Sequence, residues 1–205
     1  MVAPALRPTT SEQAITIAPI VVKSTETAER QTQMKTREEI LKTKPSDINE
    51  KFMLAAIKEA YKAYDLEECP IGCVVVKDGK IISRAHNLRI KKQCATAHAE
   101  ILAIQKACRK LDSWRLPDCD LYVTLEPCTM CSGAIIQARI RNVFFGAYEP
   151  KGGAVCSCND IFDIRHGHNH KVEYTGGILK DQCSDMLKTF FREVRENKSK
   201  IKDRS

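Results

Sequence analysis

Two short motifs carry the side chains of this sequence that are best suited to chemistry. His98 and Glu100 are two residues apart in TAHAEILAI (96–104), and Cys128 and Cys131 are three apart in EPCTMC (126–131). Polar groups that enter a core need partners, so packing alone explains neither motif. One imidazole and two thiolates suit tetrahedral zinc with one open position, which is typical of catalytic sites. A closed structural site would need a fourth protein ligand nearby.

Glu100 is the candidate proton carrier of such a site. Zinc lowers the pKa of a bound water to about 7, and a carboxylate beside that water can pass its proton to a departing group. His-x-Glu followed by Pro-Cys-x-x-Cys is more specific than an isolated Cys-x-x-Cys. It is the signature of zinc nucleobase deaminases, a group whose known members include bacterial tRNA adenosine deaminases. The alternative is a helix-end histidine and two core cysteines.

Each motif is expected at the start of a helix that follows a strand or a hairpin. A helix capped by Thr96 would run to about Leu111, and a helix with Pro127 in its first position would run to about Arg139. Cysteines three apart share one face, and the dipole and free N–H groups of a helix start favour thiolates. Both helix starts would converge at one edge of a sheet, where ligand sites of open α/β sheets tend to lie.

The rest of the pattern predicts an α/β fold. Asp47 and Glu50 have capping-box spacing before a helix, and Asp78-Gly79 is a hairpin signal. Strands are expected at 71–76, 81–87, 120–126, 142–148 and 171–175, with a last helix at 181–197. Alternating strands and helices imply a sheet that is part antiparallel and part parallel, with helices on its faces.

Composition divides the chain into three parts. Residues 1–45 are rich in Thr, Ser, Glu, Lys and Pro without periodicity, which predicts a disordered extension; an organellar transit peptide is the alternative. Residues 46–197 are expected to form one domain, and residues 198–205 a basic tail. No apolar run approaches the roughly 20 residues that a membrane-spanning helix needs, so no membrane partner is expected.

Charge and cysteine content suggest a partner and a compartment. The 205 residues carry a formal net charge of +7, which favours an anionic partner such as nucleic acid, although a solvated basic surface is the simpler explanation. The ten cysteines are scattered and follow no secretory signal. They predict reduced thiols in a cytoplasmic compartment, some buried and a few bound to metal.

From about residue 50 to residue 195 the sequence resembles the bacterial tRNA-specific adenosine deaminases, which belong to the cytidine deaminase-like zinc enzymes. The matching pieces are CPIGCVVVKDGKII, AHNLR, TAHAEILAI, LYVTLEPCTMCSGAIIQARI, VFFGAYEPKGGA and NHKVEYTGGIL. The resemblance implies a three-layer α/β/α sandwich whose mixed sheet has about five strands.

The resemblance also implies a reaction, which is the hydrolytic conversion of adenosine to inosine at the wobble position of a tRNA anticodon. It implies a homodimer with one Zn²⁺ per chain. His98, Cys128 and Cys131 match the family's zinc ligands, Glu100 its proton shuttle and Asn87 its base-binding asparagine. The amide of Asn87 offers both a donor and an acceptor to a base edge, whereas a turn-forming asparagine is the alternative.

Further expectations concern contacts with the tRNA anticodon stem-loop. The last helix carries many basic side chains, among them Arg192 and Arg195, and the family places this helix near the RNA. Glu149 and Lys151 lie in the GAYEPKGGA piece, but Glu149 stands where an aspartate or asparagine is commoner, which weakens the carry-over there. The expected buried stripe of the last helix is Leu187, Phe190, Phe191 and Val194.

One segment departs from the family pattern. Cys156-Ser157-Cys158 stands where a glycine–serine pair is more usual, and three histidines follow it: His166, His168 and His170. A second metal site is one hypothesis for these residues. Small buried cysteines and a solvated histidine loop are the alternative.

Two other functions are compatible with the zinc motif. A deaminase of free guanine or cytosine would need no RNA surface. A catalytically silent zinc protein would bind RNA or scaffold a partner subunit, and a missing shuttle glutamate would favour it; Glu100 is present.

Overall fold

The computed structural model of the protein describes residues 35–163, 165 and 167–202, which all belong to the compact unit Met34–Ser205. Residues 1–34 of the predicted extension 1–45 lie outside the described residues, as does His166. No helix among the described residues combines the length and the apolar character needed to cross a membrane.

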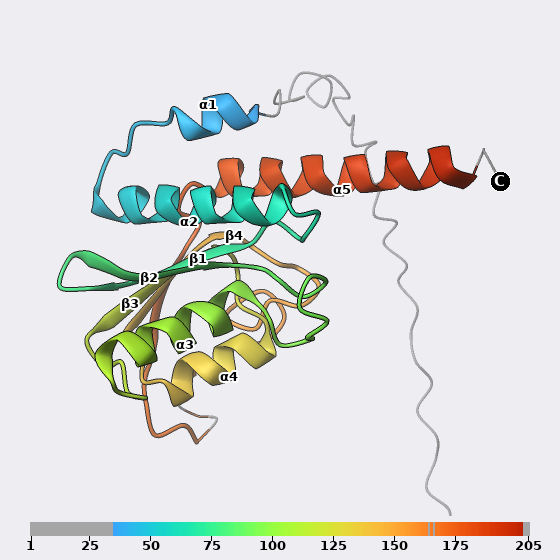
Figure 1. Ribbon diagram of the computed structural model, residues 1–205. Helices are drawn as coiled ribbons and strands as arrows, with labels where there is room; N and C mark the ends of the chain where they lie inside the picture. Colours follow the sequence, from blue (N-terminus) through green and yellow to red (C-terminus); the bar gives the residue numbers. More distant parts are fainter. Residues whose placement is uncertain (1–34, 164, 166, 203–205) are drawn as a thin grey trace, which may run out of the picture. The chain divides into compact units, whose positions relative to one another are not determined.

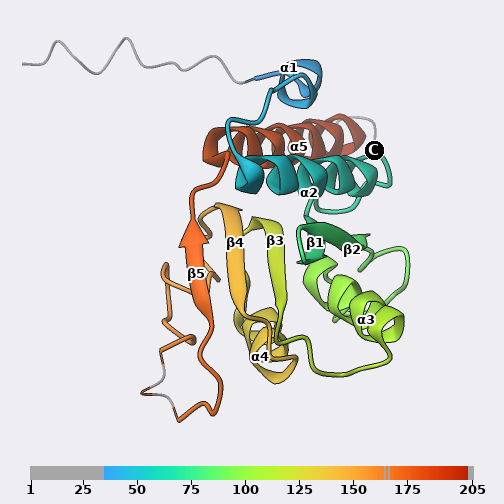
Figure 2. The same ribbon diagram turned by 90° about the vertical axis from the view of Figure 1, so that its left-hand side faces the viewer.

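The fold is built on a mixed five-stranded sheet, as the sequence predicts. The strand order is β2 (Lys80–His86), β1 (Gly72–Lys77), β3 (Cys119–Leu125), β4 (Asn142–Ala147) and β5 (Glu173–Gly176), as Figure 2 shows. The pairs β2–β1 and β1–β3 are antiparallel, whereas β3–β4 and β4–β5 are parallel. The parallel pair β3–β4 is joined by a helix, α4 (Thr129–Gln137), which is the usual connection between parallel strands, whereas β4 and β5 are joined by a long segment without an α-helix among its described residues.

Helices cover both faces of the sheet and make the three-layer sandwich (Figure 1). One layer holds α2 (Ile48–Tyr64) and α5 (Lys180–Lys202), with the short helix α1 (Arg37–Leu41) beside them. The other layer holds α3 (Ala99–Leu111) and α4 (Thr129–Gln137). Helix α2 packs so closely on the sheet that Gly72 of β1 has no room for a side chain: a Cβ there would lie 2.0 Å from the carbonyl oxygen of Ala56.

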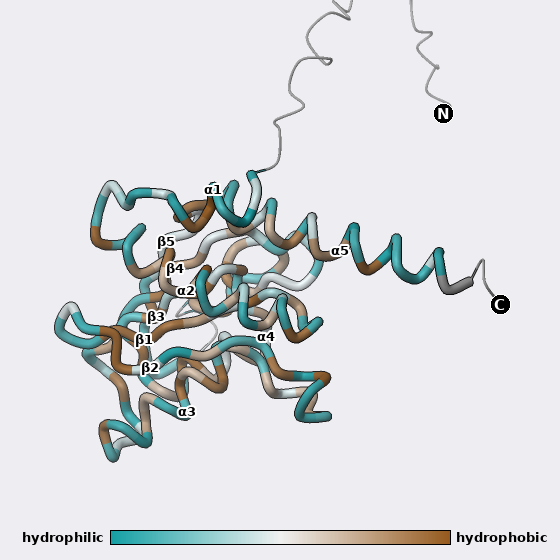
Figure 3. Tube along the Cα trace, turned by 45° about the horizontal axis from the view of Figure 1, so that its top comes forward, coloured by the Kyte–Doolittle hydropathy of each residue, from teal (hydrophilic) through white to brown (hydrophobic). Residues whose placement is uncertain are grey.

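The sheet separates two apolar clusters, and β1 contributes to both. Cys73 and Val75 point toward α3 and α4, whereas Val74 and Val76 point toward α2 and α5. This alternation is the period of two of a strand with both faces covered, and it explains why β1 reads as a continuous apolar run. The hydrophobic colouring of β1 in Figure 3 shows the same run.

The two helices that carry the motifs start later than predicted. Helix α3 starts after an N-cap at His98 rather than Thr96, and α4 after an N-cap at Cys128 rather than with Pro127. Thr96 is part of a turn, where its carbonyl oxygen accepts from the N–H of His98 at 2.7 Å. Neither N-cap side chain bonds to the helix backbone. The imidazole and the thiol are therefore free for another partner.

Helical structure extends beyond the predicted limits 46 and 197 at both ends. Residues 37–41 form α1 rather than a disordered segment, with a complete capping box between Thr36 and Glu39 and with Ile40 fully buried. Helix α5 continues to Lys202 instead of ending at Asn197. It continues because no glycine or proline interrupts the sequence after Asn197.

Candidate active site

The N-terminal ends of α3 and α4 bring three candidate metal ligands together. His98 and Cys128 are the N-cap residues, and Cys131 lies in the first turn of α4. The Nδ1 atom of His98 lies 3.8 Å from the sulfur of Cys128 and 3.6 Å from that of Cys131. Among the described residues, these are the one group of three or more His, Cys, Asp or Glu side chains whose ligand atoms all lie within 4.8 Å of one another.

The spacing of this group fits zinc. Zn–S bonds of about 2.3 Å and Zn–N bonds of about 2.0–2.1 Å at tetrahedral angles place the nitrogen about 3.6 Å from each sulfur. The observed distances of 3.6 and 3.8 Å agree with that value. No fourth His, Cys, Asp or Glu joins the group in the described part of the chain. A metal held there would keep one position for water or substrate, as in a catalytic site.

Hydrogen bonds within the group shift the pKa values of its members. The bond between the two cysteines, helped by His98, lowers the pKa of Cys128 to about 4. The same bond, together with burial, raises the pKa of Cys131. The contact with Cys128 raises the pKa of His98. The lowered pKa favours the thiolate form of Cys128, which is the form that binds metal.

Glu100 stands beside this group with one unused oxygen. It is 4% exposed, and its Oε2 atom has no hydrogen-bond partner among the described residues. Burial raises the pKa of its carboxyl group. A buried polar atom without a partner costs roughly 1–3 kcal/mol, and a water or ligand in the site would remove that cost.

A cavity of about 360 Å³ opens over these side chains. Its volume is at the lower end of the range of roughly 300–1,000 Å³ for small-ligand sites. The lining combines the catalytic candidates with apolar walls and with the segment after β4: Ile71, His98, Glu100, Leu125, Glu126, Cys128, Glu149, Lys151 and Gly152. The cavity therefore has the size and the chemistry to receive one base.

Asn87 lies directly after β2 and next to this cavity. Its backbone N–H donates to the carbonyl oxygen of Ile71 at 3.0 Å, and Ile71 lines the active-site cavity. Asn87 is 2% exposed, and its side-chain oxygen has no partner in the described part of the chain. Asn87 also lines a second cavity, of about 440 Å³, together with Cys69 and Arg89.

A third cavity, which we call the α5 cleft, leads from the active site to helix α5. It has a volume of about 690 Å³ and shares Leu125, Glu149 and Lys151 with the active-site cavity. Arg195 and Phe191 line its α5 side. Phe191 is 45% exposed, so its predicted place in the buried stripe is wrong.

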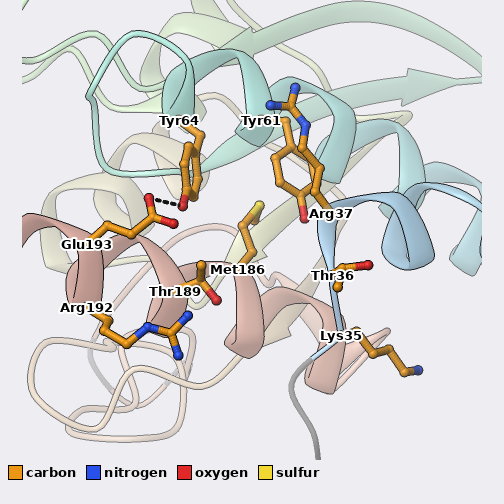
Figure 4. Close-up of a pocket in the computed structure, with 9 residues that line it drawn as sticks. All are labelled: Lys35, Thr36, Arg37, Tyr61, Tyr64, Met186, Thr189, Arg192 and Glu193. Atoms are coloured by element: carbon orange, nitrogen blue, oxygen red, sulfur yellow. Dashed lines mark hydrogen bonds between the residues drawn. The ribbon is translucent and has the colours of Figure 1, made fainter.

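Arg192 does not join the α5 cleft. Successive residues of a helix are turned by about 100°, so Arg192 leaves the side on which Phe191 lies. It lines a different cavity, between α1, α2 and α5, that also contains Lys35 and Arg37 (Figure 4). Of the two arginines predicted to contact RNA, only Arg195 lines the cleft that leads to the active site.

The hypothesis of a second metal site gains no support from the described residues. Cys156 and Cys158 are exposed, so the alternative of small buried cysteines is wrong. Nε2 of His170 pairs with the carbonyl oxygen of Ile140 at 2.7 Å. His168 joins no metal-binding group of described residues, and His166 lies outside them.

Glu126 is the first residue of the EPCTMC motif, but the sequence alone indicates no role for it. The structure places this side chain at the wall of the active-site cavity, where backbone N–H groups of the segment after β4 surround its carboxylate. An acidic residue between an apolar strand and the metal motif was the available signal in the sequence, but its hydrogen-bond partners are more than 20 residues away in the chain.

Comparisons with known proteins agree with this geometry. The MafB19-like deaminase family matches residues 46–195. The tRNA-specific adenosine deaminase of Bacillus subtilis is 48% identical over 150 residues, which cover 73% of this chain and 92% of that protein. The enzyme of the same name from Haemophilus influenzae is 45% identical over 154 residues, covering 75% and 88%.

Solved structures show the same relationship. A structure from a study of A-to-I editing by tRNA:A34 deaminases at the wobble position of transfer RNA matches with a TM-score of 0.65 and 44% identity, over 67% of this chain and 99% of that one. A guanine deaminase from Nitrosomonas europaea matches with a TM-score of 0.61 and 24% identity, over 69% and 83%, which shows the shared fold alone. The chain belongs to the family of tRNA-specific adenosine deaminases.

Proposed function

We propose that the protein converts adenosine to inosine at the wobble position of a tRNA anticodon and releases ammonia. One observation carries the proposal. Three ligand atoms at zinc spacing lie beside a buried carboxylate with an unused oxygen, in a cavity of base size, in a chain of this family. In the reaction, water adds across the C=N double bond of the amidine and the exocyclic amino group leaves as ammonia, which needs a nucleophile and a proton carrier.

The proposed cofactor is one Zn²⁺ per chain, held by His98, Cys128 and Cys131. When bound, it supplies an activated water at neutral pH. The N-cap side chains His98 and Cys128 can take part in this binding, because they make no hydrogen bond to their own helices. The ligand atoms therefore need no rearrangement of the backbone to meet a metal.

Glu100 is the proposed proton carrier. Its Oε2 accepts a proton from water, delivers it to a ring nitrogen of the base, and later assists the departure of ammonia. Asn87 is proposed to orient the base, because its buried amide has an unpaired acceptor and a backbone bond to the cavity wall at Ile71. These roles agree with buried side chains that have oxygens without a partner.

The proposed partner is the tRNA anticodon stem-loop, with Lys151 and Arg195 along the α5 cleft. An unpaired loop base enters such a cavity without the cost of opening a duplex. Glu149 is a weaker candidate, because its carboxylate accepts from the backbone N–H of Lys151 at 3.0 Å. We also propose that the protein is a homodimer and that it acts in the cytoplasm. The mass of the protein in solution measures the oligomeric state.

The decisive experiment incubates the zinc-loaded protein with an anticodon stem-loop that carries adenosine at the wobble position. We expect adenosine-to-guanosine readout at that base after reverse transcription, together with release of ammonia. Stem-loops with adenosine moved to a paired position serve as the control. Deamination of free guanine or cytosine without inosine in the RNA would support the free-base enzyme instead, and RNA binding without any product would support the silent partner subunit.

A further inference from the structure

Glu126 is a buried carboxylate that is surrounded by donors from one segment of the chain. It is 3% exposed. Its Oε1 accepts from the backbone N–H groups of Val155 at 3.1 Å, Cys156 at 2.8 Å and Ser157 at 2.9 Å. Its Oε2 accepts from the backbone N–H of Glu149 at 3.1 Å and from the hydroxyl of Ser157.

No ion pair involves Glu126 among the described residues. A buried charge without compensation is costly, so its five donors must stabilise it. Hydrogen bonds to a charged acceptor are roughly twice as strong as neutral ones, and successive N–H groups form a cradle for an anion. The cradle here is made from consecutive residues 155–157, which include the first two residues of the CSC stretch, Cys156 and Ser157.

The same segment also pairs with the backbone of the metal motif. Gly153 forms an isolated antiparallel bridge with Cys128, and the N–H of Ala154 donates to the carbonyl oxygen of Pro127 at 2.9 Å. A Cβ at Gly153 would lie 2.4 Å from the carboxylate of Glu126, so the segment approaches as closely as its backbone allows. Segment 149–157 is therefore folded around one side chain.

The residues between the two ends of this clamp line the active site. Glu126 holds Glu149 at one end and residues 155–157 at the other, and Glu149, Lys151 and Gly152 line the active-site cavity. Lys151 also lines the α5 cleft. The position of Lys151 in the active-site cavity thus depends on the carboxylate of Glu126, although no described hydrogen bond or ion pair joins these two residues.

We propose that Glu126 is a positioning residue that holds segment 149–157 in the shape that presents Lys151 to the RNA. It acts through this segment and not on the reacting atoms. The assignment rests on the proposed function for its kinetic consequence, but not for its effect on the segment itself.

The kinetic test compares Glu126→Gln with the wild type on the wobble stem-loop. Glutamine keeps the volume and one acceptor oxygen, but its amide N–H₂ faces the N–H of Glu149, which loosens that end of the clamp. We expect KM to rise about 3- to 10-fold, with kcat within about 3-fold and the zinc content unchanged. A fall in kcat of more than 100-fold at unchanged KM would overturn the proposal. The matched control is Glu59→Gln, a buried glutamate in the other helical layer, for which we expect an unchanged KM.

A double-mutant cycle identifies the route. If Glu126 acts through Lys151, then Lys151→Ala removes most of what Glu126→Gln changes, and the double variant should have nearly the KM of Lys151→Ala alone. Multiplied effects on KM would show that the two residues act independently, and would overturn the stated route.

Amide hydrogen exchange tests the clamp without RNA and without metal. In the metal-depleted protein, Glu126→Ala should exchange its amides at residues 155–157 at least about tenfold faster than the wild type, with unchanged rates in α2. Equal protection in both proteins would overturn the inference. Failure of the wild type to form inosine would overturn the proposed function instead, and the exchange rates would still decide the role of Glu126.

Discussion

The two helical layers differ in what their helix starts do. Helix α2 starts with Asp47, whose carboxylate accepts from the N–H of Glu50 at 2.9 Å, in the usual manner of a cap. Helices α3 and α4 start with His98 and Cys128, which cap nothing. A missing cap costs about 0.5–2 kcal/mol. The α3/α4 layer thus gives up local stability at the two helix starts where the proposed metal ligands lie.

The α2/α5 layer carries none of the proposed metal or catalytic side chains. Its cluster joins residues of α2 and α5 with Ile40 of α1. The guanidinium of Arg37 forms a bidentate salt bridge with the carboxylate of Asp65, with N–O distances of 2.6 and 2.9 Å, and lies over the ring of Tyr61. The comparison predicts that substitutions at the helix starts of the α3/α4 layer change chemistry, whereas substitutions of buried side chains in the α2/α5 layer change stability.

The largest effect is expected from Cys128→Ala. Loss of one of three ligands should remove zinc and with it all measurable deamination, while the fold remains. Metal analysis together with circular dichroism provides the measurement. Cys108→Ala, a half-buried cysteine of α3 outside the ligand group, is the matched control and should retain its metal. Full zinc content in Cys128→Ala would contradict the assignment of the ligands.

Glu100→Ala should separate chemistry from metal binding. We expect full zinc content and a fall in kcat of about 10²- to 10⁴-fold, which is the usual contribution of a general acid–base group. Single-turnover assays on the stem-loop measure the chemical step. Wild-type rates in this variant would exclude Glu100 as the proton carrier.

Ile40→Ala should act on the other layer. Removing a fully buried isoleucine costs about 2–5 kcal/mol, so the denaturant midpoint should fall clearly. The activity per folded molecule should not change, because α1 lines no part of the active-site cavity or the α5 cleft. Equal stability would show that α1 is not packed as described, and a lower kcat in the folded state would break the division between the layers.

Glu59 of α2 should make the stability of the protein depend on pH. Burial alone would raise its pKa, but hydrogen bonds with His86 and Lys62 outweigh burial and lower the pKa to about 2. Because the folded pKa lies below the unfolded value of 4.5, its contribution to stability is present above pH 4.5 and is lost as the pH falls toward 2. Denaturation of Glu59→Gln should show a flatter pH dependence in this window, by roughly 1–3 kcal/mol. Parallel curves for both proteins would contradict it.

The smallest effect is expected from the pair Arg195→Ala and Arg192→Ala. Arg195→Ala should weaken stem-loop binding several-fold and reduce the slope of log K against log salt by about 0.7–0.9, as loss of one phosphate contact does. Arg192→Ala should leave both values unchanged, because this residue lines the cavity beside α1. Equal effects of the two substitutions would mean that RNA reaches across α5.

Local sequence determined which groups lie at the helix starts. The order of strands and helices, the three-residue spacing of the cysteines and the position of His98 before an apolar helix are local features, and the structure contains them. Their roles in binding metal and moving protons stay predictions. The capping box of Thr36 and Glu39 was also readable locally, but the polar composition around it concealed the helix.

Only the tertiary structure decided the contacts between distant segments. The wrapping of residues 149–157 around Glu126, the docking of Ile40 and the separation of Arg192 from Arg195 depend on which elements lie side by side. Helix periodicity places Phe191 on a side of α5, but the neighbouring elements decide whether that side is covered. Sequence spacing therefore specifies which side chains lie along one element. The strand order and the packing of the layers specify which of these side chains meet, because those contacts form between residues far apart in the chain.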